Sequence, residues 1–283
     1  MKKESVHCEL LMGKIRCLLC PNYCVLKKDE TGRCGVRQNQ AGRLYSLIYG
    51  EVCSVALDPI EKKPLYHFHP GESILSLGTK GCNLKCPWCQ NFSISQDPNC
   101  ETKPMTPQEV IDRAQQLNSF GIAYTYNEPF IWYEFVCDTA RLAHSRGLKN
   151  VLVTNGYVNR KPLEEIVGLI DAMNIDVKSM QESFYQKHCQ GSLAPVLDCA
   201  EFSKKHCHIE ITNLIIPTLN DQEQDFRELV DWIAAKLGKD VPLHFSRYFP
   251  KYKSDLPATP VETLKLAEKI ALEKLEHVYL GNV

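Results

Sequence analysis

Short runs of apolar or β-branched residues alternate with amphipathic stretches from about residue 72 to the end of the chain. Such runs predict strands that are covered on both faces, and helices between them. The predicted strands are Ser73–Leu77, Ile122–Thr125, Asn150–Val153, Ala172–Asp176, His208–Ile215, Pro242–Arg247 and His277–Leu280.

Several helices have start signals in the sequence. Thr106-Pro107-Gln108-Glu109 and Thr259-Pro260-Val261-Glu262 each have the order of an N-cap, an N1 proline and a capping-box glutamate. Asn220-Asp221-Gln222-Glu223 predicts the start of a third helix, and Ile131–Arg146 predicts a fourth that Gly147 ends.

Repeated strand–helix units predict an α/β fold with parallel strands and right-handed crossovers. Six or seven units favour a partial (β/α)6 TIM-like barrel. A doubly wound dinucleotide-binding sheet is disfavoured because no G-x-G-x-x-G follows the first strand. Residues 1–71 lack the alternation, so we expect a small N-terminal cysteine-rich appendage (1–71) before the barrel (72–283).

Composition narrows the class of protein. Of 283 residues, 44% are hydrophobic, which is enough for a sizeable core. A net charge of −1 gives no overall basic character that would favour nucleic acid. Neither an apolar run of membrane-spanning length nor an export signal is visible. We therefore expect a cytoplasmic protein that binds neither nucleic acid nor a membrane.

The 14 cysteines change this picture. Four lie between Cys17 and Cys34, and three between Cys82 and Cys89. In a reducing compartment, clustered thiols are more often metal ligands than disulfides. The other seven are scattered, and we expect them to be small buried hydrophobic residues.

Cys82, Cys86 and Cys89 follow the first predicted strand with the spacing C-x3-C-x2-C. Three thiolates would bind three corners of a four-iron cluster and leave the fourth iron open, as a reactive site requires. A zinc site would need a fourth ligand, for which Cys100 or His69 is available. Cysteines that merely pack in a core are disfavoured because the loop is polar.

Together with Trp88, these three cysteines resemble the signature of the radical S-adenosylmethionine (SAM) superfamily. The resemblance implies a 4Fe–4S cluster whose open iron binds SAM. It also implies reductive cleavage of SAM to a 5′-deoxyadenosyl radical that abstracts hydrogen from a substrate.

Polar residues follow the next strands, at the ends where barrel active sites form. They resemble the SAM-contacting stretches of the superfamily and of activating enzymes for glycyl radical proteins. Both glycines of the usual glycine-glycine-glutamate motif are replaced, so only Glu128 carries over, with Asn127 as a backbone position. The resemblance implies SAM contacts at Asn127, Glu128, Thr154, Asn155, Asp176, Lys178 and Asn213, beside Trp88, and a catalytic role for Lys178.

The region from Cys17 to Val283 resembles the radical SAM enzyme of the AmmeMemoRadiSam system, a family similar to pyruvate formate-lyase activating enzyme. The motifs that carry this resemblance are Cys17-x2-Cys20-Pro21-x2-Cys24, Gly32-Arg33-Cys34-Gly35-Val36-Arg37 and Asp58 to Phe68. Members of that family commonly continue past the position of Val283 into another cysteine-bearing tail, which this sequence does not contain.

Cys17, Cys20, Cys24 and Cys34, spaced C-x2-C-x3-C-x9-C, can complete one metal site. Tetrahedral zinc and an auxiliary iron–sulfur cluster both remain open. Lys62 and Lys63 could steer an anionic substrate, although loop lysines are usually solvated. His67 and His69 are expected to pack rather than to bind a metal.

These features predict a radical SAM enzyme with an unidentified small-molecule or protein substrate and an electron donor such as flavodoxin or ferredoxin. We expect its reaction site between Glu128, Asn155, Lys178 and Arg247, under a lid formed by the 58–71 loop. An activase that generates a glycyl radical on a partner protein is one alternative. A noncatalytic zinc or iron–sulfur scaffold, or an electron carrier, is another.

Overall fold

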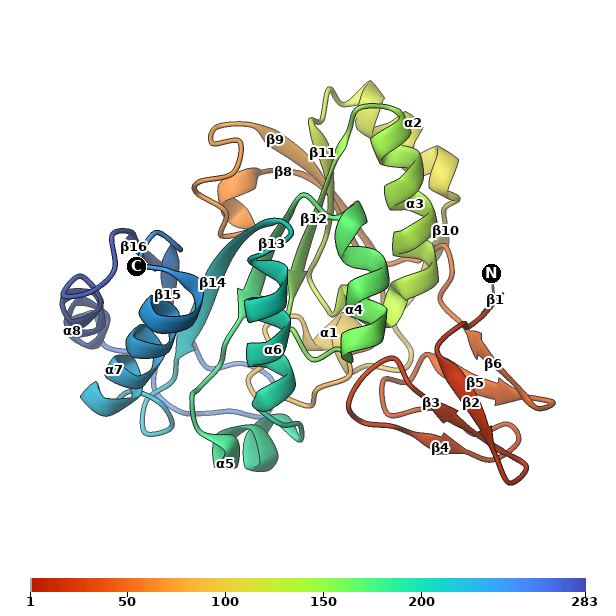
Figure 1. The fold of residues 1–283 in the computed structure, drawn as a ribbon, viewed down its shortest axis with the longest axis horizontal. Helices are drawn as coiled ribbons and strands as arrows, with labels where there is room; N and C mark the ends of the chain where they lie inside the picture. The colour runs from red at the N-terminus through yellow and green to blue at the C-terminus, as the bar shows by residue number, and fades with distance from the viewer. Residues whose placement is uncertain (1) are drawn as a thin grey trace.

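The computed structural model describes residues 2–283, and eight strands of this range form one curved sheet (Figure 1). Seven of them are parallel, as the alternation predicted, and β8 at one edge is antiparallel. β16 forms the opposite edge, so the described sheet is a partial barrel. In spatial order the strands are β16 (Val278–Gly281), β15 (Leu243–Arg247), β14 (His208–Ile215), β13 (Ala172–Asp176), β12 (Lys149–Thr154), β11 (Gly121–Tyr124), β9 (Ser73–Gly78) and β8 (Ser54–Pro59).

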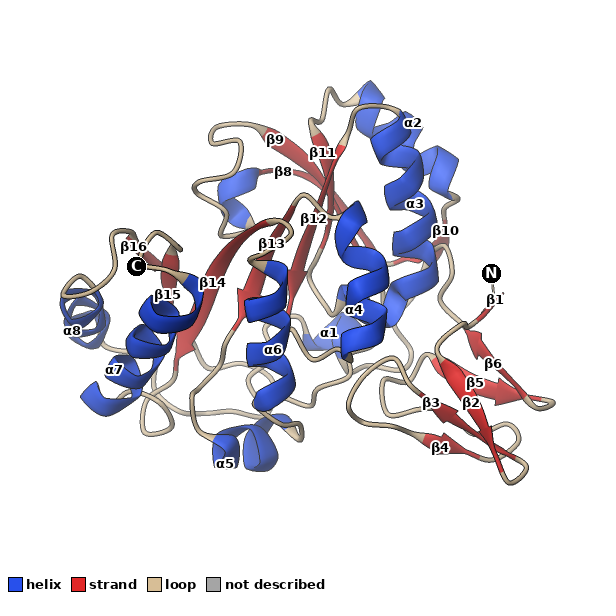
Figure 2. Cartoon of the chain, in the orientation of Figure 1, coloured by secondary structure: helices blue, strands red, loops and turns tan. Residues whose placement is uncertain are grey.

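The longer helices cover the outer face of this sheet (Figure 2). They are α2 (Pro107–Gln116), α3 (Tyr133–Ser145), α4 (Arg160–Ile166), α6 (Ala194–Ser203), α7 (Glu223–Trp232) and α8 (Val261–Ala271). Short turns are α1 (Phe92–Ser95), α5 (Glu182–Phe184), the 3-10 turns Ile60–Lys62, Pro129–Trp132 and Val167–Leu169, and the π-helical turns Tyr185–Cys189 and Ile233–Leu237. Within residues 2–283, no helix is both long and apolar enough to cross a membrane.

The two Thr-Pro helix starts behave differently. Thr106 and Glu109 form the predicted capping box at the start of α2. At α8 the prediction is wrong, because Pro260 is the N-cap and no side chain caps the helix. The Thr259 hydroxyl donates to the Ile215 carbonyl at 2.6 Å and accepts from the Tyr248 N–H at 3.1 Å. Thr259 therefore connects β14 to the chain that follows β15 rather than capping α8.

Strand β8 lies within the expected appendage but is part of the main sheet. All six of its residues pair with β9, so the boundary expected at residue 72 falls inside this hairpin. Val55 and Leu57 are exposed, whereas the charged Asp58 is buried, so the alternation along the strand is the reverse of the apolar-in pattern that predicts a strand from sequence.

Residues 60–72, here called the floor segment, join β8 to β9 and close the barrel at the amino ends of its strands. Ile60 and Leu65 are fully buried in one apolar cluster with Ile74, Ala123 and Val151 of the barrel strands. The cluster loop follows β9 at the opposite, carboxyl end. The expected lid over the reaction site is therefore wrong, because this segment fills the bottom of the barrel instead.

The floor segment is anchored on Glu210 of β14, whose side chain is fully buried. Its two oxygens accept the backbone N–H groups of Tyr66 and His67 at 3.0 and 2.7 Å. The Nε2 atoms of His208 and His244 lie 3.0 and 2.6 Å from the same oxygens. Burial alone would raise the pKa of Glu210, but these partners lower it to about 2.

The N-terminal region forms two small antiparallel sheets beside the barrel (Figure 1). They contain β1 (Lys3–Glu4), β6 (Arg43–Ser46) and β5 (Arg37–Gln40), and β2 (Cys8–Leu11), β3 (Lys14–Cys17) and β4 (Val25–Leu26), while β7 (Glu51–Val52) pairs with β10 (Lys103–Pro104). Arg37 connects the region to α3 through a buried two-bond ion pair with Glu134, at 3.0 and 2.7 Å.

Replacing Glu210 should loosen the floor. At pH 7 we expect Glu210→Gln to lower the free energy of unfolding by about 2–4 kcal/mol. The glutamine has one oxygen and an NH2 group, so it cannot accept hydrogen bonds from both backbone N–H groups and both histidines. The folded pKa of about 2 lies below the ordinary 4.5, so this stabilisation is complete above pH 4.5. The difference between wild type and variant should then shrink as the pH falls from 4.5 toward 2. Urea unfolding across this range, with Glu276→Gln as an exposed control, measures it, and a pH-independent difference would contradict the assignment.

Candidate functional site

The loop after β9 carries Cys82, Cys86 and Cys89, and all three line one cavity of about 330 Å³. Gly81 starts the loop with φ +90°, and a Cβ there would lie only 2.6 Å from the Cys34 carbonyl oxygen. Glycine is therefore required by both conformation and space. The sequence prediction that the three thiols share a site is consistent with this placement.

Contacts from other parts of the chain hold the loop. Asn83 is fully buried, donates to the Tyr157 carbonyl at 2.7 Å and accepts from the Asn155 amide at 2.9 Å. The Lys85 N–H donates to the Cys189 carbonyl at 2.9 Å. Trp88 lines the cavity and packs on Phe184 and His188. Asn83 and Lys85, which make the loop polar, therefore also fix its shape.

The three thiols are poorly solvated. Burial raises the pKa of Cys82 and of Cys89, and a hydrogen bond with Cys189 together with burial raises that of Cys86. The thiols therefore retain their protons until a metal replaces them. Asn155 Nδ2 lies 3.7 Å from Cys82 Sγ, and Ser95 Oγ lies 3.1 Å from Cys89 Sγ, so donors to bound sulfur are in place.

Within residues 2–283, no group of three or more His, Cys, Asp or Glu side chains is already arranged to hold a metal ion. A closed zinc site takes four ligands, whereas the three cysteines of a four-iron cluster bind separate irons and leave one iron open. Three thiols on the wall of one cavity of about 330 Å³ therefore fit a cluster better than a zinc ion. Neither Cys100 nor His69, proposed as a fourth zinc ligand, lines this cavity.

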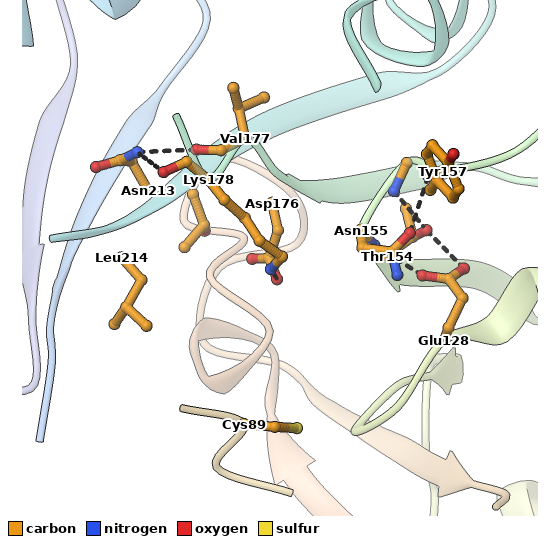
Figure 3. Close-up of polar contacts among 12 residues, drawn as sticks. Cys89, Glu128, Thr154, Asn155, Tyr157, Asp176, Val177, Lys178, Asn213 and Leu214 are labelled. Atoms are coloured by element: carbon orange, nitrogen blue, oxygen red, sulfur yellow. Dashed lines mark hydrogen bonds and ion pairs between the residues drawn. The ribbon is translucent and has the colours of Figure 1, made fainter. Parts of the chain in front are cut away.

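Polar residues at the ends of four strands reach the same cavity. Asn127, Thr154, Asn155, Asp176 and Lys178 line it, as predicted from their positions at or after the ends of β11, β12 and β13, and Thr212 of β14 is the contribution of the fourth strand. Lys178 Nζ and an Asp176 oxygen form an ion pair at 2.9 Å near the centre of the site (Figure 3). Burial alone would lower the pKa of Lys178, but the Asp176 carboxylate holds it well above the ordinary range.

Glu128 occupies a different place from the one its motif implied. It is fully buried and does not line the cavity. Its oxygens accept from the Phe130 N–H, the Thr154 hydroxyl and the Asn155 N–H at 2.8–2.9 Å (Figure 3). Burial raises its pKa to about 7 despite these donors. In the structure Glu128 holds the cavity wall from behind rather than presenting its carboxylate to a ligand.

Two further predicted residues also lie outside the cavity lining. Asn213 donates to the Val177 and Lys178 carbonyls at 2.8 and 3.4 Å, which fixes the backbone that carries Lys178. Arg247 donates to the Thr259 carbonyl at 2.8 Å. Placing Arg247 in the reaction site is therefore wrong, and Ser246 of the same strand lines the cavity instead.

The sequence indicates Lys62 and Lys63 only as residues that could steer a substrate, and it predicts no role in the site for Cys189; both lysines line the cavity. Lys63 lines the cavity and is only 2% exposed; its ammonium lies 2.7 Å from Asp58, which also accepts from the Tyr126 hydroxyl at 2.7 Å. Cys189 is fully buried, as expected for the scattered cysteines, and a π-helical turn also brings its thiol to Cys86. Nothing in the sequence indicates that Lys63 would be buried, and a lone cysteine carries no signal for a position beside Cys86.

The four N-terminal cysteines form a second group, which lines a separate void of about 10 Å³. Cys17 and Cys20 are buried, and Cys24 and Cys34 are partly exposed. The void lies beside the cluster loop, because the Cys34 carbonyl contacts Gly81 and Asn22 donates to the Asn83 carbonyl at 2.9 Å.

Comparison with known proteins agrees with this geometry. The sequence model of the radical SAM superfamily matches residues 76–233, more than half of the chain. An uncharacterised protein of Methanocaldococcus jannaschii is 45% identical, over 100% of this chain and 86% of its own length. A protein of the same organism that is named as a glycyl-radical enzyme activating enzyme is 26% identical, over 72% of this chain and 84% of its own length. The pyruvate formate-lyase-activating enzyme of Listeria monocytogenes is 24% identical, over 54% and 66%.

Solved structures share the fold at low sequence identity. Streptococcus suis SuiB bound to S-adenosylmethionine superposes with a TM-score of 0.58 at 11% identity, over 74% of this chain and 52% of that one. A domain of a pyruvate-formate lyase-activating enzyme from Bacteroides vulgatus gives 0.51 at 17%, over 57% and 99%. Both confirm the partial-barrel prediction.

A substitution at Glu128 distinguishes a structural role in the cavity wall from a direct contact with SAM. Glu128→Gln places an NH2 group against backbone donors, so we expect it to lower the free energy of unfolding by about 1–3 kcal/mol. Urea unfolding measures the loss, and calorimetric titration with SAM measures ligand affinity. If the carboxylate contacted SAM directly, the variant would lose affinity at unchanged stability, and the assignment to the wall would be wrong. Glu164→Gln, on α4, is the control.

Proposed function

Because this chain belongs to the radical SAM superfamily, we propose that it cleaves SAM reductively and abstracts a hydrogen atom from a substrate held in the 330 Å³ cavity. The observation that carries the proposal is that Cys82, Cys86 and Cys89 share this cavity with the strand-end residues. Superfamily membership also sets aside the noncatalytic scaffold and electron-carrier alternatives.

The three thiolates would hold the 4Fe–4S cluster and leave one iron for SAM. When bound, cluster and SAM together supply the 5′-deoxyadenosyl radical. The cavity wall provides polar groups at Asn127, Thr154 and Asn155 for the methionine moiety. Lys178 adds a positive charge beside Cys86, which stabilises the negative charge that thiolate ligands bring to a buried site.

Glu128 and Asn213 act as positioning residues in this proposal. Glu128 fixes Thr154 and Asn155 through its hydrogen bonds, and Asn213 fixes the backbone at Lys178. Leu84, Trp88, Val153 and Leu214 give the cavity apolar surfaces. A reactive alkyl radical needs such a site, because water exclusion prevents its loss to side reactions.

The substrate is proposed at the level of class only. A protein substrate is supported by relatives named as activating enzymes for glycyl-radical enzymes and for pyruvate formate-lyase. A small molecule is supported by the cavity wall at Lys63, where a buried charge pair with Asp58 adds polar groups to the cavity. Flavodoxin or ferredoxin is the proposed class of electron donor.

Removing the cluster ligands tests the core of the proposal. Protein purified without oxygen should bind about four irons at this site, and replacement of Cys82, Cys86 and Cys89 by alanine should remove them. Formation of 5′-deoxyadenosine from SAM under strong reductant should then stop. Cys100→Ala combined with Cys207→Ala is the control and should retain both properties. Continued 5′-deoxyadenosine formation by the triple variant would refute the site assignment.

Isotope transfer separates the two substrate classes. We expect slow cleavage of SAM by the protein alone, and a faster reaction with the true substrate, since productive transfer needs a donor hydrogen about 3–3.5 Å away. The mass of 5′-deoxyadenosine reports where that hydrogen comes from. Deuterium from a glycine of a partner protein would establish the activase, and deuterium from a small molecule would exclude it. SAM that stays intact with every candidate would contradict the radical mechanism.

A further inference from the structure

Four cysteines outside the radical site surround a space of a very different size. Cys17 ends β3, Cys20 and Cys24 follow in the turn to β4, and Cys34 lies between β4 and β5. Their void of about 10 Å³ is about the volume that one water-sized particle requires. The radical-site cavity is about 330 Å³. The smaller space suits a single ion and is too small for a four-iron cluster.

We propose that Cys17, Cys20, Cys24 and Cys34 bind one structural zinc ion, which supports the loop that carries the radical-site cysteines. Four thiolates form a closed tetrahedral set typical of structural zinc. No ligand position is left open for a substrate, so the site would stabilise structure rather than catalyse a reaction. This decides between the zinc and iron–sulfur alternatives that spacing alone left open.

Arg37 provides independent support from the wall of the void. It is only 1% exposed, and its terminal nitrogens are paired with Glu134 and the Ser5 hydroxyl. Its Nε is one of the few buried side-chain polar atoms in residues 2–283 without a hydrogen-bond partner. A metal-bound thiolate is the acceptor that would satisfy this N–H, and donors to ligand sulfur are a regular feature of such sites.

The thiols are not yet arranged around one point in the structure, as the absence of any ready three-ligand group in residues 2–283 shows. Zinc binding would displace their protons into solvent, and changes of side-chain rotamer would turn the sulfurs inward while the backbone stays.

The position of the site gives it a role. The Cys34 carbonyl contacts Gly81 directly, and Asn22, between Cys20 and Cys24, donates to the Asn83 carbonyl. The Leu18 and Leu19 carbonyls accept from Asn159, which follows the Asn155 turn. A metal that fixes residues 17–34 would therefore fix one side of the cluster loop. The strands here are short, so the ion would supply folding energy that their core does not.

Metal analysis of the full-length triple alanine variant at Cys82, Cys86 and Cys89 tests the proposal without interference from the radical cluster. We expect about one zinc per chain and no acid-labile sulfide. Adding Cys17→Ser and Cys20→Ser should remove the zinc and increase hydrogen exchange in residues 14–40. Cys8→Ser is the matched control and should retain zinc, because Cys8 pairs with Cys17 in the sheet but does not line the void.

If the triple variant contains iron and sulfide instead of zinc, the four cysteines bind an auxiliary cluster and the zinc assignment is wrong. If it contains no metal, the site itself is refuted. If the Cys17 and Cys20 variants fail to fold, the triple variant itself gives the answer. Titration with a mercurial thiol reagent should release one zinc per chain, and Co²⁺ in its place should show tetrahedral thiolate absorption. A cobalt spectrum of oxygen or nitrogen ligation would overturn the ligand assignment. None of these measurements depends on SAM cleavage, so they test the zinc site separately from the proposed function.

Discussion

The loop between Gly81 and Cys89 has no regular secondary structure, and the site depends on the contacts that hold it. The Cys34 carbonyl of the N-terminal region lies so close to Gly81 that a Cβ there would be 2.6 Å away, and the turn after β12 holds the loop through the hydrogen bond from Asn155 to Asn83. The π-helical turn Tyr185–Cys189 accepts the Lys85 N–H. π-Helical turns are frequent at functional sites. Here that turn places a buried thiol next to Cys86, so the geometry of the cysteines is set by three distant segments at once.

The two ends of the barrel differ in polarity, and the floor segment covers only one of them. The carboxyl ends of the strands carry the polar cavity wall, as in other barrels of this architecture. The amino ends would be open to water without the floor segment, whose Ile60 and Leu65 fill the interior. Lys63 lies between the two ends and neutralises Asp58 within the barrel. The chain thus uses one connection, from β8 to β9, both to close the bottom and to shape the cavity.

Periodicity predicted the parallel strands well because most of their residues are buried, which favours apolar runs. It missed β8, where exposed Val55 and Leu57 alternate with residues that face inward. Motifs located the cavity but did not assign every role. Whether Glu128 faces a ligand or its own chain depends on hydrogen bonds to Thr154 and Asn155 that no local pattern encodes. The predicted helix start at Thr259 shows the same limit, because the Thr259 hydroxyl donates to the Ile215 carbonyl of β14 and does not cap α8.

Two fully buried glutamates show how the protein distributes charge. Glu210 in the floor has two histidines and two backbone donors, and its pKa falls to about 2. Glu128 beside the cluster loop has only neutral donors, with Asp176 nearby, and its pKa rises to about 7. The charged form of Glu128 would also repel a thiolate at Cys82, whose pKa it raises. The wall of the radical site therefore disfavours further negative charge and places the Lys178 cation at Cys86, which is the electrostatic balance that three partly buried thiolate ligands require.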